Sequence, residues 1–513
     1  MKQISRMADV VLTGGGMICI AFAFYNVLVH GWAWHYGLPV VAAALLLGIR
    51  RLNQSTKLNT TVLLISLLLP IYASELFLAR GMVSHLRFDA HDWLNFPSDF
   101  NAQDAMERMQ TGRMSSTAYD TRTRLQVVAD LRHQGIPAYP LIFPELMFQT
   151  GGPSGIRSLF TINNEEVLPL SGLSKTPTVF CNESGEYIVY ESDLFGFHNP
   201  SDAWEVPVHI AAVGDSFTHG ACVPSEHGFV AKIRSRYDST VNLGMNGNGP
   251  LSMLATLREY GSTLRPRIVL WVYFEGNDSR DLDRREKRSP LLMKYLEPSF
   301  TQGLIHRQPE IDHILRSYLD DAMRNNAVNY DAEQFLKLRY LRKSLGALLK
   351  KRPLVNGIDG EIVESLRAFG APSQKADRDL FRTILAKANR MVASWGGRMY
   401  FVYLPTWERY RLPDLASQDR DTVLNIVKEH QMPLIDLHST FAKHPDPLSL
   451  FPTRRYAHYT VAGHQLVAEE VLRHLPADEQ PVSSVQPKQA VRSFKENDSG
   501  EGGTSVAGRL TAN

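Results

Sequence analysis

A serine that follows a buried-strand pattern is the first residue in this chain placed to do chemistry. The apolar run at 208–213 ends at a glycine, Asp215 and Ser216 follow, and a second glycine lies at position 220. The pattern predicts a buried strand that stops at a sharp turn and presents the Ser216 hydroxyl at its carboxyl end. Open α/β sheets bind ligands at that edge, and a serine there can attack if a base reaches it. Alone, such a serine is more often a turn or helix-cap residue.

Three later stretches offer the other groups that ester cleavage needs. Gly247 closes a glycine-containing loop after a second predicted strand, and Asn277 follows a third. His458 lies just before the last predicted helix. Backbone N–H groups, an amide and an imidazole beside a serine can form an oxyanion hole and a general base. Taken singly, Gly247 is a loop glycine, Asn277 a turn residue and His458 a structural histidine.

These four stretches, in this order, resemble the conserved blocks of the SGNH, or GDSL-type, hydrolase superfamily over residues 205–475. The resemblance implies Ser216 as nucleophile, with its backbone N–H in the oxyanion hole. It implies Gly247 and Asn277 as the other oxyanion donors and His458 as general base. It also implies a flavodoxin-like fold, with a five-stranded parallel sheet in the order 2-1-3-4-5 and helices on both faces. No metal or organic cofactor is implied.

One position departs from the family pattern. The family usually has an aspartate three residues before the catalytic histidine, and here Arg455 stands there. An imidazole without an acid is less well oriented and less stabilised when it is charged. A backbone carbonyl in that role and a loss of activity are the alternatives to a substitute acid. Three acids are candidates that the sequence does not rank: Asp193, Asp436 and Asp446. His219 and His464 lie near the motifs but not at the family's base position.

The elements that must hold these residues are strands alternating with helices. We expect strands at 208–214, 240–244, 267–274, 398–404 and 433–437, and helices at 377–394, 420–430 and 460–474. Such alternation predicts a parallel sheet wrapped on both faces. A charged helical insertion at about 280–370 interrupts it. The insertion could form a lid or a partner surface, but a solvated helical excursion is the favoured interpretation.

The first 80 residues predict a membrane anchor of about three transmembrane helices. Apolar runs cover 10–29, 38–49 and 60–79, and spans of about 20 residues cross a bilayer. Lys and Arg precede the first run and fill the second loop, at Lys2, Arg6, Arg50, Arg51 and Lys57. The positive-inside rule therefore places the N-terminus in the cytoplasm and everything after residue 80 outside it, in the periplasm if the chain is bacterial.

Two regions flank the hydrolase-like part. Residues 81–204 predict a mixed α/β lead-in, with a helix at 121–133, that packs on the next domain rather than forming a separate binding module. Residues 476–513 are rich in Ser, Gly, Pro, Gln and Glu, which predicts a disordered tail.

Composition argues against nucleic-acid and zinc binding, but it does not settle whether the cysteines form a disulfide. The 513 residues carry a formal net charge of only +2, so bulk charge does not favour nucleic-acid binding. No zinc-type spacing of Cys and His is present. Cys19 lies in an apolar run, whereas Cys181 and Cys222 could pair in an oxidising compartment. Buried free thiols are the slightly favoured interpretation.

The favoured function is a membrane-anchored ester hydrolase acting outside the cytoplasm. Location and family habit suggest O-acetyl groups of an envelope or secreted polysaccharide as its substrate. A polysaccharide O-acyltransferase with the same Ser216 and His458, working with biosynthesis or export partners, is the second hypothesis. The third is a non-enzymatic carbohydrate-binding or assembly protein on a degenerate scaffold, which Arg455 favours.

Overall fold

The computed structural model describes most of the chain, and it divides into two compact units. The described residues are 2–30, 37–81, 120, 122, 124–149, 155–183, 185–205, 207–336, 338, 341, 373–415, 418–454 and 458–476. One unit comprises 1–83 and 329–351, and the other comprises 84–328 and 352–513. The predicted disordered tail, apart from Pro476, and Arg455 lie outside the described residues.

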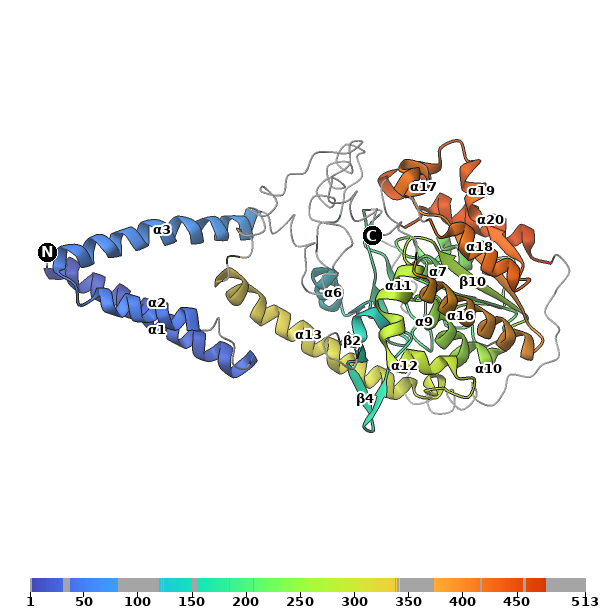
Figure 1. Cartoon of the computed structure of the whole chain (residues 1–513), viewed down its shortest axis with the longest axis horizontal. Coiled ribbons are helices and arrows are strands. Elements are labelled where there is room, and N and C mark those ends of the chain that lie inside the picture. Colours follow the sequence, from blue (N-terminus) through green and yellow to red (C-terminus); the bar gives the residue numbers. More distant parts are fainter. Residues whose placement is uncertain are drawn as a thin grey trace. The chain divides into compact units, whose positions relative to one another are not determined.

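The first unit consists mainly of the apolar helices (Figure 1). They are α1 (Lys2–His30), α2 (Gly37–Ile49) and α3 (Gln54–Gly81). Lys57 Nζ lies 2.9 Å from Asp9 Oδ2 and Arg50 Nε 3.7 Å from Asp9 Oδ1, which joins α1 to the start of α3. Among the described residues, only Gln54–Glu75 is both long and apolar enough to cross a membrane, and α2 is a shorter apolar helix. All three predicted apolar segments therefore form helices, but a three-span topology is not shown.

A five-stranded parallel sheet forms the centre of the second unit. Its strands are β8 (Ile210–Val213), β9 (Thr240–Asn242), β10 (Ile268–Phe274), β11 (Arg398–Leu404) and β12 (Leu434–Asp436). They lie in the order β9-β8-β10-β11-β12, and every neighbouring pair is parallel. β8 and β10 are buried along their whole length because both faces of the sheet are covered.

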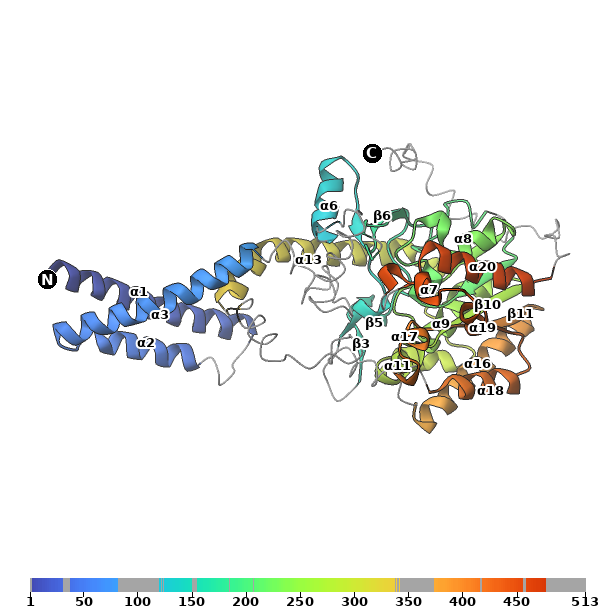
Figure 2. The same cartoon turned by 90° about the horizontal axis from the view of Figure 1, so that it is seen from above.

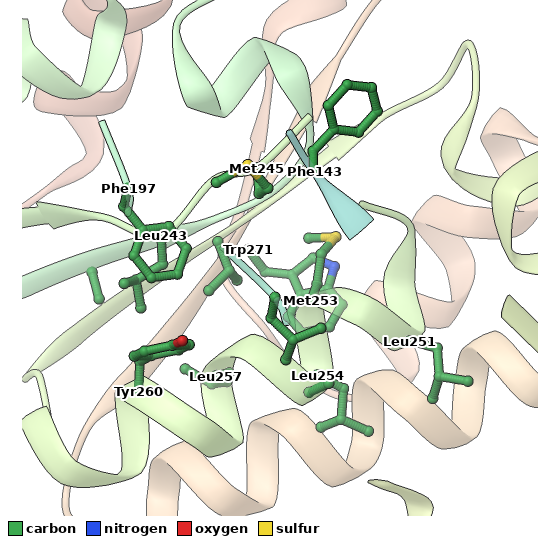
Figure 3. Packing of buried hydrophobic residues seen from close by; sticks show 14 of the residues in the cluster. Phe143, Phe197, Leu243, Met245, Leu251, Met253, Leu254, Leu257, Tyr260 and Trp271 are labelled. Carbon is green, nitrogen blue, oxygen red and sulfur yellow. The ribbon is translucent and has the colours of Figure 1, made fainter. Parts of the chain in front are cut away.

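Helices cover the two faces of this sheet. Alternate strand residues such as Trp271 and Phe401 share one core with α9 (Pro250–Thr256), α16 (Lys375–Ser394) and α18 (Arg420–Glu429), and Figure 3 shows part of this packing. The residues between them, such as Val272 and Val402, face the other core. That core contains α8 (Phe229–Arg234), α19 (Leu437–Ala442) and α20 (Val461–His474). α8 packs beside α20 (Figure 2).

The predicted elements of this region are confirmed. Each of the five strands and three helices begins and ends within two residues of its expected position. Long apolar runs separated by amphipathic segments are strong local signals, which is why they could be located without any tertiary information.

Much of the described lead-in shares with the sheet the first core, which contains Trp271 and Phe401, whereas Val127, Val128, Ala138 and Val179 form a separate small cluster. They form α6 (Arg124–His133), β1 (Tyr139–Pro140), β2 (Phe148–Gln149), β3 (Arg157–Ser158), β4 (Phe160–Ile162), β5 (Glu165–Val167), β6 (Pro177–Val179) and β7 (Val189–Glu191). β6 pairs with β1 in parallel and with β7 in antiparallel fashion. Phe143, Leu170, Phe197 and Trp204 are buried in the same cluster as Trp271.

The beginning of the insertion corrects the expectation of a solvated excursion. It forms α11 (Asp278–Arg284), α12 (Pro290–Met293) and α13 (Gln308–Leu336). Leu292, Tyr295 and Leu315 are fully buried in the first core. The high content of charged residues suggested a solvated segment. The apolar side chains are spaced among the charged ones so that they lie on one face of each helix, and this face is buried. Most of 337–372 lies outside the described residues.

The structure also corrects the expectation of free thiols at two cysteines. Cys181 and Cys222 form a disulfide, and their Cα atoms are 5.3 Å apart, within the usual range for such a bond. The pairing arises because the β6–β7 loop packs against the segment that follows β8. Cys19 is free.

Candidate active site

The turn after β8 presents Ser216 at the carboxyl edge of the sheet. Ser216 begins the short helix α7 (Ser216–His219), and Asp215 caps it by accepting a hydrogen bond from the N–H of Phe217 at 3.0 Å. Gly214 is required at the strand end because a Cβ there would lie 2.0 Å from Thr218 Oγ1. The turn is therefore tight and fixes the direction of the serine side chain.

His458 bridges Ser216 and an acid. Its Nε2 lies 2.8 Å from Ser216 Oγ, and its Nδ1 lies 2.9 Å from Glu183 Oε1. The backbone N–H of His458 donates to Glu183 Oε2 at 2.9 Å. A carboxylate at Nδ1 favours the tautomer with a proton there, which leaves the Nε2 lone pair free to accept from the serine hydroxyl. The His458 side chain is 23% exposed, so this arrangement is open to a substrate.

Glu183 is the residue that sequence reasoning missed. It lies in the loop between β6 and β7, which belongs to the lead-in rather than to the region of family resemblance. Its side chain is buried against the His458 loop. One signal could have found it. Cys181 lies just before Glu183 and Cys222 lies just after Ser216, so a disulfide between the two cysteines brings Glu183 and Ser216 together.

The three acids considered from sequence have other partners. Asp193 accepts from the backbone N–H groups of two nearby residues, and from Asn199 and Trp204 at 2.7 Å each. Asp436 caps α19 and pairs with Arg420. Asp446 pairs with Arg454. Each is engaged in holding local structure, and Glu183 instead occupies the position beside Nδ1.

The loop after β9 packs directly on the turn that carries Ser216. Met245 N–H donates to Gly214 O at 3.1 Å, and a Cβ on Gly244 would lie 2.6 Å from Thr218 Cβ. Gly247 has a φ of +71°, a conformation that favours glycine. Arg285 Nη2 donates to Gly247 O at 2.8 Å and therefore holds this turn from the insertion side.

Asn277 lies beside the same turn from the end of β10. It occupies the N-cap position of α11, yet its side chain makes no capping hydrogen bond. Its amide is close enough to Asp215 to lower the pKa of that carboxyl. A residue that served only as a helix cap would direct its side chain to the helix backbone, whereas the Asn277 amide lies close to Asp215, beside Ser216.

Two buried carboxyls near Ser216 carry less negative charge than exposed carboxyls would. Burial raises the pKa of Asp215 to about 7, and the imidazole of His458 opposes this rise in part. Burial and the nearby charge of Asp215 raise the pKa of Asp278 well above its usual range. At neutral pH these two groups therefore carry less negative charge than an exposed pair would. The repulsion of an anion forming at Ser216 is reduced accordingly.

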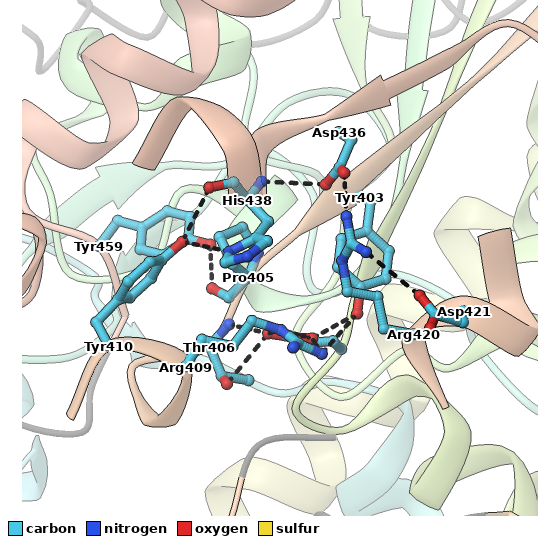
Figure 4. Close-up of polar contacts among 11 residues, drawn as sticks. Tyr403, Pro405, Thr406, Arg409, Tyr410, Arg420, Asp421, Asp436, His438 and Tyr459 are labelled. Atoms are coloured by element: carbon cyan, nitrogen blue, oxygen red, sulfur yellow. Dashed lines mark hydrogen bonds and ion pairs between the residues drawn. The ribbon is translucent and has the colours of Figure 1, made fainter. Parts of the chain in front are cut away.

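The loop that carries Asn277 is fixed by a buried ion pair. Arg409 Nε donates to both carboxylate oxygens of Glu275, at 2.7 and 2.6 Å, and Thr406 N–H donates to Glu275 Oε1 at 2.7 Å. Tyr403 OH also bonds to this carboxylate. Figure 4 shows Tyr403, Thr406 and Arg409 gathered at this point. Glu275 thereby holds the end of β10 to the segment after β11.

Two other histidines lie near the motifs without contacting Ser216. His219 Nε2 is 2.8 Å from Tyr190 OH, and its Nδ1 accepts from Asn246 N–H at 3.3 Å. His464 Nδ1 accepts from Phe229 N–H at 3.3 Å. Burial lowers the pKa of His219 well below its usual value and that of His464 to about 3. Both are neutral structural residues.

One group of potential metal ligands occurs among the described residues. Glu183, Cys222 and His458 offer atoms within 4.8 Å of one another. Cys222 Sγ is bonded to Cys181 in the disulfide, and a cysteine binds a metal ion only as a free thiolate. The oxidised chain therefore offers an ion only the carboxylate and imidazole, which already bond to each other.

No protein-family model matches the chain, and no curated protein is significantly similar to it. Among solved structures, a member of the lipolytic protein G-D-S-L family from Veillonella parvula is 14% identical, with a TM-score of 0.27, over 52% of this chain and 98% of that one. A lipase/acylhydrolase from Enterococcus faecalis is 14% identical, with a TM-score of 0.29, over 54% of this chain and all (100%) of that one. An acetyl-xylooligosaccharide esterase variant from Geobacillus is 13% identical, with a TM-score of 0.29, over 54% of this chain and all (100%) of that one. These identities and TM-scores are too low to assign a function to this chain.

Proposed function

We propose that this protein is a serine ester hydrolase with Ser216 as nucleophile, His458 as general base and Glu183 as the acid that orients the imidazole. The single observation that carries the proposal is the position of His458 between the other two, at 2.8 Å from Ser216 Oγ and 2.9 Å from Glu183 Oε1. A chance cluster would not combine this geometry with a serine on a strand-to-helix turn.

The proposed reaction proceeds in two halves. Ser216 Oγ attacks the acyl carbonyl while His458 Nε2 takes the hydroxyl proton, and the leaving alcohol then receives that proton. Water next attacks the acyl-enzyme, with the same nitrogen as base, and releases the acid. Glu183 stabilises the imidazolium that exists in both halves. The backbone N–H groups of Ser216 and Gly247 and the amide of Asn277 are the proposed donors to the oxyanion.

The compartment is part of the proposal. We place the hydrolase unit outside the cytoplasm, anchored by the apolar helices of the first unit. Two independent observations support this: the Lys and Arg residues cluster at the start of α1 and before α3, and Cys181 pairs with Cys222. The first follows the positive-inside rule, and structural disulfides form in oxidising compartments. An O-acetyl group on an envelope or secreted polysaccharide is the proposed substrate.

The test is turnover of p-nitrophenyl acetate and release of acetate from an acetylated polysaccharide by the purified protein. Ser216→Ala should abolish both activities while the thermal midpoint stays near that of the wild type, because removing one hydroxyl leaves little cavity. Ser225→Ala is a matched control, since Ser225 bonds to His198 Nε2 at 2.8 Å and not to His458. Turnover that survives in Ser216→Ala would reject the assignment. Acetate transferred to an added sugar acceptor would identify acyl transfer instead.

A further inference from the structure

The acid of the proposed site belongs to a loop whose base, at Phe180, lies in the first core. Glu183 lies between β6 and β7, where Phe180 N–H donates to Ile188 O at 2.8 Å and Ile188 N–H donates to Cys181 O at 2.9 Å. These bonds close the base of the loop. Glu183 stands beyond them, towards His458. Its distance from the imidazole therefore depends on how the loop is tied to the rest of the site.

A covalent tie occurs two residues before Glu183. Cys181 is bonded to Cys222, which lies six positions after Ser216 on the segment leaving the nucleophile turn. Cys222 Sγ is also 3.8 Å from His458 Nδ1, the atom that faces Glu183. The crosslink thus joins the β6–β7 loop, which carries Glu183 (the acid loop), to the segment that follows Ser216 (the nucleophile segment), close to His458.

We propose that the Cys181–Cys222 disulfide is a positioning element that keeps Glu183 on His458, and that its reduction slows catalysis without unfolding the sheet. This inference rests on the proposed hydrolase function. The sheet and its two cores do not depend on the crosslink, because β8, β10 and β11 are paired along their length and buried on both faces. Loss of the crosslink should loosen the tip of the loop, since removing its one covalent tie leaves it more conformations, although Asp120 N–H still donates to Gly185 O and Asn182 Nδ2 to Asp120 O.

The redox step is a thiol–disulfide exchange with a dithiol reductant. A reductant thiolate attacks Cys181 Sγ, which is on the more exposed of the two cysteines, and Cys222 leaves as a thiolate. The second reductant thiol then displaces Cys181, so that the reductant becomes a disulfide and the protein gains two thiols after protonation. Two electrons are transferred. The freed Cys222 could then bind a metal with Glu183 and His458, so a chelator is needed in the assay.

The experiment is a double-mutant cycle on the full chain in detergent. It compares the wild type, Cys181→Ala/Cys222→Ala, Glu183→Gln and the triple variant. If the crosslink acts through Glu183, its removal should lower kcat at least about tenfold with KM changed by less than about twofold. The same removal in Glu183→Gln should change kcat by less than about twofold. Wild-type protein reduced with dithiothreitol, freed of it and assayed anaerobically in EDTA should behave like the double cysteine variant.

Several results would overturn the proposal. One is an unchanged kcat in the cysteine variant. Another is an equal loss of kcat in both backgrounds, which would mean a general structural role. Cys19→Ala is the control for removal of a cysteine outside the crosslink, and thermal midpoints report any loss of fold.

A readout that needs no turnover separates this inference from the hydrolase proposal. Absence of Ser216-dependent turnover in the wild type would reject the function. Hydrogen exchange would still test the crosslink: the amides of Gly185 and Ile188 should exchange faster after reduction, while those of β10 stay protected. Unchanged exchange in the loop would reject the positioning role.

Discussion

In the proposed mechanism, Glu183 takes the role that the sequence resemblance assigns to an aspartate near the histidine. Its two oxygens engage both Nδ1 and the backbone N–H of His458, each at 2.9 Å. This pair of bonds fixes the ring and its loop together. A longer side chain arriving from another part of the chain can therefore replace an acid that the local sequence lacks, and Arg455 by itself does not indicate an inactive scaffold.

Glu183→Gln should lower kcat by on the order of a hundredfold to ten-thousandfold, because an amide can hold the imidazole in the wrong tautomer and does not stabilise its charged form. Glu183→Asp should retain more activity, since the carboxylate remains but is one methylene shorter. Glu186→Gln is the matched control, as Glu186 is exposed on the same loop. Steady-state kinetics with p-nitrophenyl acetate measure all three. A wild-type rate in Glu183→Gln would contradict the assignment.

Asn277→Ala should lower kcat by on the order of a hundredfold with little change in KM, because the oxyanion charge exists only in the tetrahedral state. Its side chain makes no capping bond to α11, so any fall in the thermal midpoint should come from the lost contact with Asp215 and should leave the protein folded at the assay temperature. Asn277→Asp should be no better, since an ionised carboxylate repels the oxyanion. A destabilised Asn277→Ala with normal kcat per folded molecule would instead make the residue a structural turn.

Strands and helices were predictable because their signals are local. The apolar run of β10 and the amphipathic pattern of α16 each identify one element without reference to the rest of the chain. Ser216 and His458 could be proposed because each lies at the junction of such an element. Glu183 was missed because its loop carries no periodic pattern and reaches the site through tertiary packing and the disulfide, so that only the positions of the two cysteines hinted at it.

The turn at Gly247 links an element to catalysis and can be tested against a matched glycine. Gly247→Ala and Gly135→Ala both place a Cβ in a left-handed conformation, at φ of +71° and +82°. The backbone conformation alone should lower the free energy of unfolding by roughly 1–2 kcal/mol in each, and Gly247→Ala should lose more, because its Cβ would lie 2.7 Å from Glu145 Oε2 and 3.0 Å from Glu145 Cβ. Gly135 lies between α6 and β1, and a Cβ there meets nothing within 4 Å.

Only Gly247→Ala should also lower kcat, by on the order of tenfold or more, because its N–H is a proposed oxyanion donor and small displacements are costly in such a site. Denaturant unfolding and kinetics on the same preparations separate the two effects. Equal kcat in the two variants would remove Gly247 from the oxyanion hole.

At the scale of the whole molecule, chemistry and location constrain each other. A structural disulfide such as Cys181–Cys222, which ties the Glu183 loop to the segment after Ser216, is typical of proteins in oxidising compartments. The cations flanking the apolar helices favour the same placement by an unrelated mechanism, the charge dependence of membrane insertion. A cytoplasmic hydrolase unit would be in conflict with both.

The topology follows from these two arguments and can be measured in cells. A reporter that is active only outside the cytoplasm should give signal when fused after residue 100, and none when fused after Arg51, because the second loop carries Arg50, Arg51 and Lys57. A reporter active only in the cytoplasm should give the reverse pattern. Acid-trapped, alkylated cells should also show Cys181 and Cys222 oxidised and Cys19 free. Cytoplasmic signal after residue 100 would reverse the topology, and it would remove both the envelope substrate and the oxidising environment on which the crosslinked site depends.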